Sequence, residues 1–224
     1  APDLTARALI ALRAAGWRRA PLRIEVRKRI PVAAGLGGGS ADAAAVLRLA
    51  AGDLEPERLH EIATGLGADV PSQLEPRFAL VGGAGERVVP LPAPDPFWAV
   101  LLPDRAGLST ADVFAEADRL GLARGEDALR RLRGELLAAA AAGASPLDYP
   151  ALLVNDLTAA AVSLRPSVEE ALAALRAAGA EHALMTGSGP TAIGLFRGEA
   201  AALGAADRLA PDREAIVARS GTMR

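Results

Sequence analysis

The chain has 224 residues, of which 51% are hydrophobic and 3% aromatic, and its formal net charge is −2. It has no cysteine, which excludes disulfides and thiolate metal sites, and its two histidines, His60 and His182, are too far apart in sequence to indicate a zinc site. The absence of a basic tail argues against nucleic acid as a partner. No apolar run of about 18 residues and no signal peptide are present, so we expect a cytoplasmic protein without membrane association.

The first elements expected are a helix over residues 1–15 and a strand over residues 22–28. Asp3 or Thr5 can cap the helix, and Gly16 suits its end. In 22–28, apolar and charged residues alternate, as is typical of a half-buried strand.

A glycine-rich loop follows, with glycine at 35, 37, 38 and 39, and an Ala- and Leu-rich helix is expected from Ser40. Strand, glycine loop and helix start in this order predict a phosphate cradle, because bare backbone N–H groups and a positive helix end favour an anion. Ser40 can cap the helix or offer its hydroxyl to a phosphate or to magnesium. A flexible turn without a ligand is the alternative. The loop lacks the Gly-Lys-Ser/Thr ending of the Walker pattern, and Ser40 breaks the G-x-G-x-x-G pattern.

A second helix is expected over residues 53–66 and is followed by Gly-Ala-Asp-Val-Pro at 67–71. Asp69 is a candidate functional acid, and capping of a short helix that begins at Pro71 is an equally good interpretation. Residues 78–91 predict a hairpin whose glycines serve its turn.

Three prolines within residues 92–96 indicate a linker, so we place a domain boundary between two regions, 1–94 and 95–224. The second region predicts a strand, several helices, two strands, a helix and a final strand. That order favours an α+β fold with a split β-α-β arrangement of the ferredoxin kind. Gly187-x-Gly189-x-x-Ala192 is not a dinucleotide site, since the residues after Pro190 indicate a strand and not a helix.

Three stretches resemble the signatures of the GHMP kinases, the superfamily of galactokinase, homoserine kinase and mevalonate kinase. They are Ile-Pro-Val-Ala-Ala-Gly-Leu-Gly-Gly-Gly-Ser-Ala at 30–41, Gly-Ala-Asp-Val-Pro at 67–71 and Met-Thr-Gly-Ser-Gly-Pro-Thr at 185–191. Shorter similarities occur at 85–86, 108–114 and 155–157, so the resemblance covers nearly the whole chain. It is strongest to the branch that phosphorylates a cytidine-diphosphate-linked polyol in the non-mevalonate isoprenoid pathway.

The resemblance implies a two-lobed fold with a mixed-sheet N-terminal lobe. It also implies ATP and Mg²⁺ as cofactors, with no dedicated metal site of the protein's own, and Asp69 as the acid that accepts the substrate's hydroxyl proton. The implied ATP-binding residues are Pro31, Val32, Ala33, Ala34, Gly35, Leu36, Gly37, Gly38, Gly39, Ser40 and Ala41. The implied active-site loop is Thr186, Gly187, Ser188 and Gly189, and the implied substrate-binding residues are Thr110 and Phe114.

On its pattern alone, Phe114 is better explained as a core residue of an amphipathic helix. The oligomeric state is not fixed by the sequence, and a homodimer stays open. Two other functions compete: a GHMP kinase for another small alcohol, of the homoserine or mevalonate type, and a degenerate GHMP fold without catalysis.

Members of this branch begin with a strand carrying Pro-x-Lys-x-Asn and a stretch with Asp-Gly-Tyr-His, and residues 1–224 contain neither. We therefore expect a chain that starts at residue 1 to have at most a trace of kinase activity and to expose apolar residues of an incomplete sheet.

Overall fold

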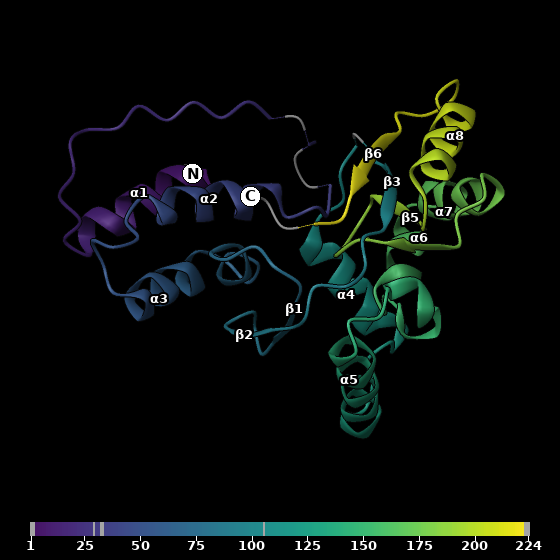
Figure 1. The fold of residues 1–224 in the computed structure, drawn as a ribbon, viewed down its shortest axis with the longest axis horizontal. Helices are drawn as coiled ribbons and strands as arrows, with labels where there is room; N and C mark the ends of the chain where they lie inside the picture. The colour runs from purple at the N-terminus through teal and green to yellow at the C-terminus, as the bar shows by residue number, and fades with distance from the viewer. Residues whose placement is uncertain (1–2, 29, 32–33, 105, 222–224) are drawn as a thin grey trace. The chain divides into compact units, whose positions relative to one another are not determined.

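The computed structural model describes residues 3–28, 30–31, 34–104 and 106–221. Contacts between residues divide the chain into two compact units (Figure 1). The described part of the first consists of residues 3–28 and 37–91, and that of the second of 30–31, 34–36, 92–104 and 106–221. The division into domains at residue 94 stays a prediction. In the described ranges no helix is long and apolar enough to cross a membrane.

The core of the first unit lies between three helices: α1 (Leu4–Ala14), α2 (Gly38–Arg48) and α3 (Pro56–Leu66). The Asp3 side chain caps α1 by accepting a 2.9 Å bond from the Ala6 amide, as predicted. Leu12 of α1 and Leu47 of α2 are fully buried in this core. Alanines at the helix contacts lose little side-chain entropy on burial and let the helices pack closely.

A short 3₁₀ helix, η1 (Pro71–Gln73), and a hairpin complete the first unit. The hairpin joins β1 (Ala79–Gly82) to β2 (Arg87–Pro90) in antiparallel register, which confirms the prediction for residues 78–91. In the described residues this two-stranded sheet stands where the resemblance implied a mixed sheet.

The strand predicted over residues 22–28 is wrong. Residues 21–28 form no strand, and Figure 1 draws them as irregular chain. Leu22 and Ile24 are 40% and 38% exposed. A strand is held by bonds to a neighbour, and none of the described strands pairs with this segment. The alternating pattern is present, but the pairing that would make it a strand is not.

The second unit is built on a four-stranded antiparallel sheet in the order β4-β5-β3-β6. Its strands are β3 (Trp98–Leu102), β4 (His182–Met185), β5 (Ala192–Phe196) and β6 (Ile216–Arg219). Their order in the chain and in the sheet is that of the split β-α-β fold of the ferredoxin kind, so the predicted α+β class is confirmed.

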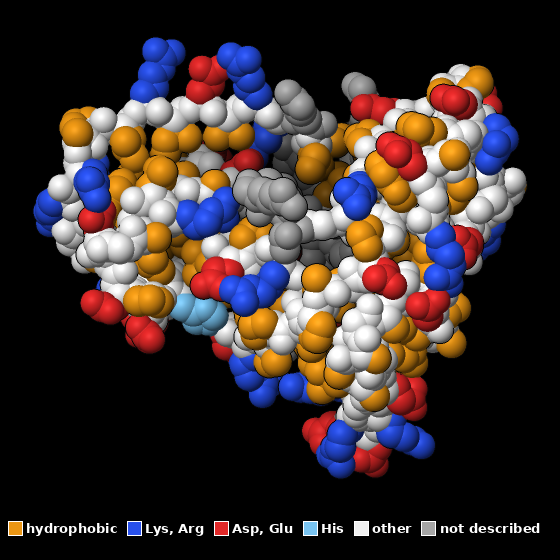
Figure 2. Space-filling view, viewed as in Figure 1, with side chains coloured by type: hydrophobic (Ala, Val, Ile, Leu, Met, Phe, Trp, Pro, Cys, Tyr) orange, Lys and Arg blue, Asp and Glu red, His pale blue; other side chains and the backbone are white. Residues whose placement is uncertain are grey.

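Helices pack on this sheet and extend from it. They are α4 (Thr110–Leu120), α5 (Glu126–Ala141), η2 (Pro146–Asp148), η3 (Pro150–Leu152), α6 (Thr158–Leu164), α7 (Ser167–Ala177) and α8 (Glu199–Leu209). Buried side chains of α4, α6, α7 and α8 join those of β3 and β5 in one core. In contrast, α5 buries only Ala140, and Figure 2 shows acidic and basic side chains gathered over one end of it.

A buried carboxylate joins α4 to α6. Glu116 accepts two 2.6 Å bonds from the Arg119 guanidinium and a 2.5 Å bond from the Ser163 hydroxyl, and its side chain is only 10% exposed. The Arg119 bonds, followed by the Ser163 bond, lower the pKa of Glu116 from its usual 4.5 to about 2. The folded state therefore favours the ionised form.

This depressed pKa predicts a loss of stability in acid. The contribution of Glu116 to the free energy of unfolding is fully present above the pKa of the unfolded state. It is lost as the pH falls through the pKa of the folded state, between about pH 5 and pH 2. Glu116→Gln should flatten the acid side of the curve of melting temperature against pH. Glu169→Gln is the control, because Glu169 forms an exposed ion pair with Arg176. Equal curves for the two variants would contradict the assignment.

Candidate functional site

The predicted phosphate cradle is a left-handed turn that leads into α2. Gly37 has φ +64° and is the N-cap of α2, with no side chain bonded to the helix start. The first intrahelical bond runs from the Ala41 amide to the Gly37 carbonyl at 2.9 Å. The amides of Gly38, Gly39 and Ser40 therefore precede the helix's own bonds and lie at its positive end. Backbone alone can donate to an anion here.

The structure corrects the expected start of this helix. It begins at Gly38, so Ser40 is its third residue and not its cap. The reason is the positive φ of Gly37, which completes the turn and lets the following glycines adopt helical angles. The Ser40 hydroxyl is then available for the other predicted role, toward a phosphate or a metal ion. Val32 and Ala33 of the predicted loop lie outside the described residues.

Before the cradle in the sequence, the backbone of Gly35 packs closely against the turn between β4 and β5. A Cβ on Gly35, where φ is +75°, would lie 2.7 Å from the carbonyl oxygens of both Thr186 and Gly189. A Cβ on Gly187 would in turn lie 3.1 Å from the Gly35 oxygen. The Thr186 hydroxyl donates a 2.8 Å bond to that same oxygen. Two backbones thus touch at a distance that only glycine allows.

The predicted substrate-binding residues lie on the helix beside this turn. Thr110, in the first turn of α4, shares a 2.8 Å hydrogen bond between its hydroxyl and that of Ser188. Phe114 follows four positions later, on the same face of the helix. It is 53% exposed, so its alternative interpretation as a core residue is wrong. An exposed aromatic ring one helical turn from Thr110 is available for stacking.

Asp69 is an exposed acid on a fixed backbone. Val70 after it is fully buried, and the Ser72 hydroxyl donates a 2.9 Å bond to the Asp69 carbonyl. The capping interpretation is not supported, because the N-cap of η1 is Val70 and no side chain caps this helix. Within the described residues the Asp69 carboxylate has no hydrogen bond or ion pair, so it is free to accept a proton.

The hairpin supports the Asp69 loop, a role that the sequence did not indicate. A Cβ on Gly85, where φ is +106°, would lie 1.9 Å from the Ala68 carbonyl oxygen. On the other side of the turn, His60 of α3 forms a 2.7 Å bond between its Nε2 and the Glu86 carbonyl. The residue before Asp69 is therefore packed against a hairpin that α3 holds. The only signal was the Gly-Gly-Ala-Gly-Glu run, which also fits a simple turn.

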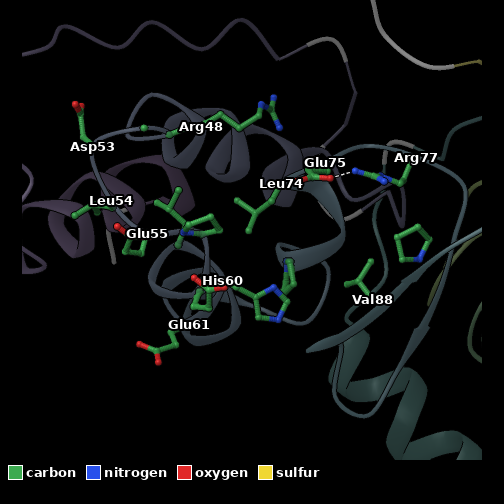
Figure 3. Close-up of a pocket in the computed structure, with 17 residues that line it drawn as sticks. Arg48, Asp53, Leu54, Glu55, His60, Glu61, Leu74, Glu75, Arg77 and Val88 are labelled. Atoms are coloured by element: carbon green, nitrogen blue, oxygen red, sulfur yellow. Dashed lines mark ion pairs between the residues drawn. The ribbon is translucent and has the colours of Figure 1, made fainter.

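A cavity of about 1060 Å³ lies elsewhere in the first unit, between α3, η1 and β2. Apolar side chains such as Leu54 and Leu74 line it together with charged ones, and Figure 3 shows Glu75 and Arg77 as an ion pair at its edge. None of the predicted site residues lines this cavity, so we do not assign the chemistry to it. Residues 34–36, Thr110 and the turn at 186–189 come together in the second unit, whereas residues 37–41 and Asp69 belong to the first.

Comparison with known proteins shows the family of the chain. Residues 3–82 match the GHMP kinases N terminal domain, and residues 126–212 match the GHMP kinases C terminal domain. The chain is also 42% identical over 229 residues to a 4-diphosphocytidyl-2-C-methyl-D-erythritol kinase of Streptomyces coelicolor. This alignment covers 99% of the chain and 72% of that relative. The chain belongs to the GHMP kinases.

Further relatives and solved structures resemble the chain. A kinase of the same name from Thermobifida fusca is 46% identical over 175 residues, covering 76% of the chain and 55% of that relative. A crystal structure of 4-(cytidine 5'-diphospho)-2C-methyl-D-erythritol kinase matches with TM-score 0.75 and 35% identity. The match covers 99% of this chain and 79% of the chain in that crystal structure. Homoserine kinase from Cytophaga hutchinsonii, at 21% identity and TM-score 0.74, shares the fold. The chain spans between about half and three quarters of the length of these sequence relatives.

The contact between the hairpin and the Asp69 loop predicts a strong effect of Gly85→Ala. The substitution adds a Cβ at positive φ and forces it into the Ala68 carbonyl, so unfolding should require about 3 kcal/mol less. Gly52→Ala is the matched control: Gly52 has φ +85° but nothing within 4 Å of an added Cβ, so only the backbone strain of about 1 kcal/mol is expected. Urea unfolding measures both. Equal losses would show that the contact with Ala68 is unimportant.

Proposed function

We propose that this GHMP kinase transfers the γ-phosphoryl group of ATP to a hydroxyl of 4-diphosphocytidyl-2-C-methyl-D-erythritol, a step of the non-mevalonate isoprenoid pathway. The observation that carries the proposal is the start of α2, where three successive amides follow a glycine N-cap and no side chain caps the helix. A phosphate group is the ligand that such a helix start favours. The substrate class is supported by the names of the relatives at 42% and 46% identity.

Each part of the site has a role in this proposal. ATP, when bound, supplies the group to be transferred. The amides of Gly38, Gly39 and Ser40 orient its phosphates and stabilise their negative charge. Asp69 accepts the proton of the attacking hydroxyl, since its carboxylate is exposed and forms no bond within the described ranges. Phe114 offers its ring to the cytosine base, and Thr110 with the turn at 186–189 borders the substrate.

Magnesium is proposed to enter with the nucleotide. The described residues contain no group of three or more histidine, aspartate or glutamate side chains that could hold a metal ion. Mg²⁺ is commonly bound by one or two protein oxygens together with substrate phosphates. We propose that the hydroxyl of Ser40, the third residue of α2, is the protein oxygen that binds Mg²⁺.

The test is turnover with ATP in the protein as its gene encodes it, on three alcohols: the diphosphocytidyl substrate, homoserine and mevalonate. We expect phosphorylation of the first. Asp69→Asn keeps the size of the side chain but cannot accept the proton, so kcat should fall roughly a hundredfold. The melting temperature should be unchanged, because the carboxylate makes no bond within the described residues. Phosphorylation of homoserine or mevalonate alone would assign another substrate, and no turnover on any of the three would favour a non-catalytic GHMP fold.

Phe114 tests the substrate assignment separately. Phe114→Ala removes the proposed stacking surface and should raise KM for the diphosphocytidyl substrate roughly tenfold, the usual scale for losing one base–aromatic contact. KM for ATP should stay the same. Leu129→Ala is the control, because Leu129 is 49% exposed on α5. Similar effects on both substrates, together with a lower melting temperature, would indicate that Phe114 only supports the fold.

A further inference from the structure

The side chain of Asn155 is bonded to the turn that touches the glycine loop. Asn155 lies between η3 and α6, and its Nδ2 donates two bonds of 2.8 Å, one to the Met185 carbonyl and one to the Gly187 carbonyl. Its Oδ1 accepts a 3.0 Å bond from the Leu157 amide. Both N–H groups of the amide and one lone pair of its oxygen are therefore used. The side chain is half-buried.

The two carbonyls that Asn155 binds flank Thr186. Met185 ends β4, opposite Ala192 of β5, so the first bond fixes the point at which the turn leaves the sheet. The second bond fixes the carbonyl just after Thr186. With both held by one planar amide, the backbone of Thr186 has little freedom, and its hydroxyl is directed at the Gly35 carbonyl, 2.8 Å away. The Thr191 amide adds a 3.3 Å bond to the Ala34 carbonyl on the other side of the turn.

We propose that Asn155 is a positioning residue for the glycine loop. It sets the shape of the turn at 185–189, and the turn holds Gly35 and hence the entry to the phosphate cradle. Asn155 acts through this turn and does not touch ATP. All of these residues belong to the second compact unit. The catalytic consequence rests on the proposed kinase function, whereas the structural link from Asn155 to the loop does not.

The two ends of the Asn155 amide have separable effects. The bond from Leu157 to Oδ1 closes a local Asx turn before α6, and an aspartate would keep it. The bonds to Met185 and Gly187 need N–H donors, and an aspartate would place an oxygen against two carbonyl oxygens. Asn155→Asp therefore removes the link to the turn and preserves the local turn. Asp156→Asn is the matched control, because Asp156 pairs with Arg124 and has no bond to the turn.

The first measurement is amide hydrogen exchange without nucleotide. The reporters are the Gly189 amide, bonded to the Thr186 carbonyl at 2.8 Å, and the Thr191 amide, bonded to the Ala34 carbonyl. In Asn155→Asp both should exchange roughly tenfold faster, the scale expected for the loss of about one net hydrogen bond. Asp156→Asn should leave both unchanged. Unchanged exchange in Asn155→Asp would overturn the proposal.

The second measurement is steady-state kinetics of the protein as its gene encodes it. Asn155→Asp should raise KM for ATP and lower kcat, each by roughly tenfold, because misplaced donors weaken both binding and transition-state stabilisation. KM for the alcohol should not change. Faster exchange with unaltered kinetics would reduce Asn155 to a structural residue and overturn its positioning role. If the unsubstituted protein shows no turnover, the proposed function fails, and the exchange result alone still decides whether Asn155 controls the loop.

Discussion

The contact of two glycine-containing backbones is the constraint on which the site depends. Gly35 lies against the carbonyls of Thr186 and Gly189, and the Thr186 hydroxyl bonds the Gly35 carbonyl. These segments are 151 positions apart in the sequence, so no local preference brings them together. The second unit's sheet does so, because it ends β4 and begins β5 where the turn is needed. A side chain at Gly35 would separate the backbones, because its Cβ would lie 2.7 Å from both carbonyl oxygens.

The glycine loop therefore has two parts that differ in structure. Its first part, up to Leu36, is fixed by tertiary contact, whereas its second part, from Gly37, provides unbonded amides at the start of α2. Groups that become ordered only when a ligand binds lose conformational entropy, which weakens binding. Backbone N–H donors that are already oriented avoid this loss. A rigid first part and a helical second part both reduce that entropy loss.

Much of the fold could be predicted because its signals are local. Helix caps such as Asp3, the hairpin at 79–90 and the strand order of the second unit follow from periodicity and turn residues. The strand expected at 22–28 was wrong because alternation describes the faces of a strand and not its partner. The start of α2 was placed too late because glycines seldom begin a helix unless a positive φ precedes them. The support of Ala68 by Gly85 and the bonds of Asn155 could not be predicted, since both join residues distant in sequence.

The chain passes from the first compact unit to the second at Ile30, returns inside the glycine loop between Leu36 and Gly37, and crosses again after Leu91. No single cut can therefore release the two units as complete pieces. A break after residue 91 would leave Ala34 and Gly35 on the first fragment. Their bonding partners, Thr191 and Thr186, would be on the other fragment. When two such fragments associate, the bonds between the glycine loop and the turn at 186–191 would have to form between separate chains. Gene fusions and circular permutations are better tolerated at exposed connections such as the one between α4 and α5.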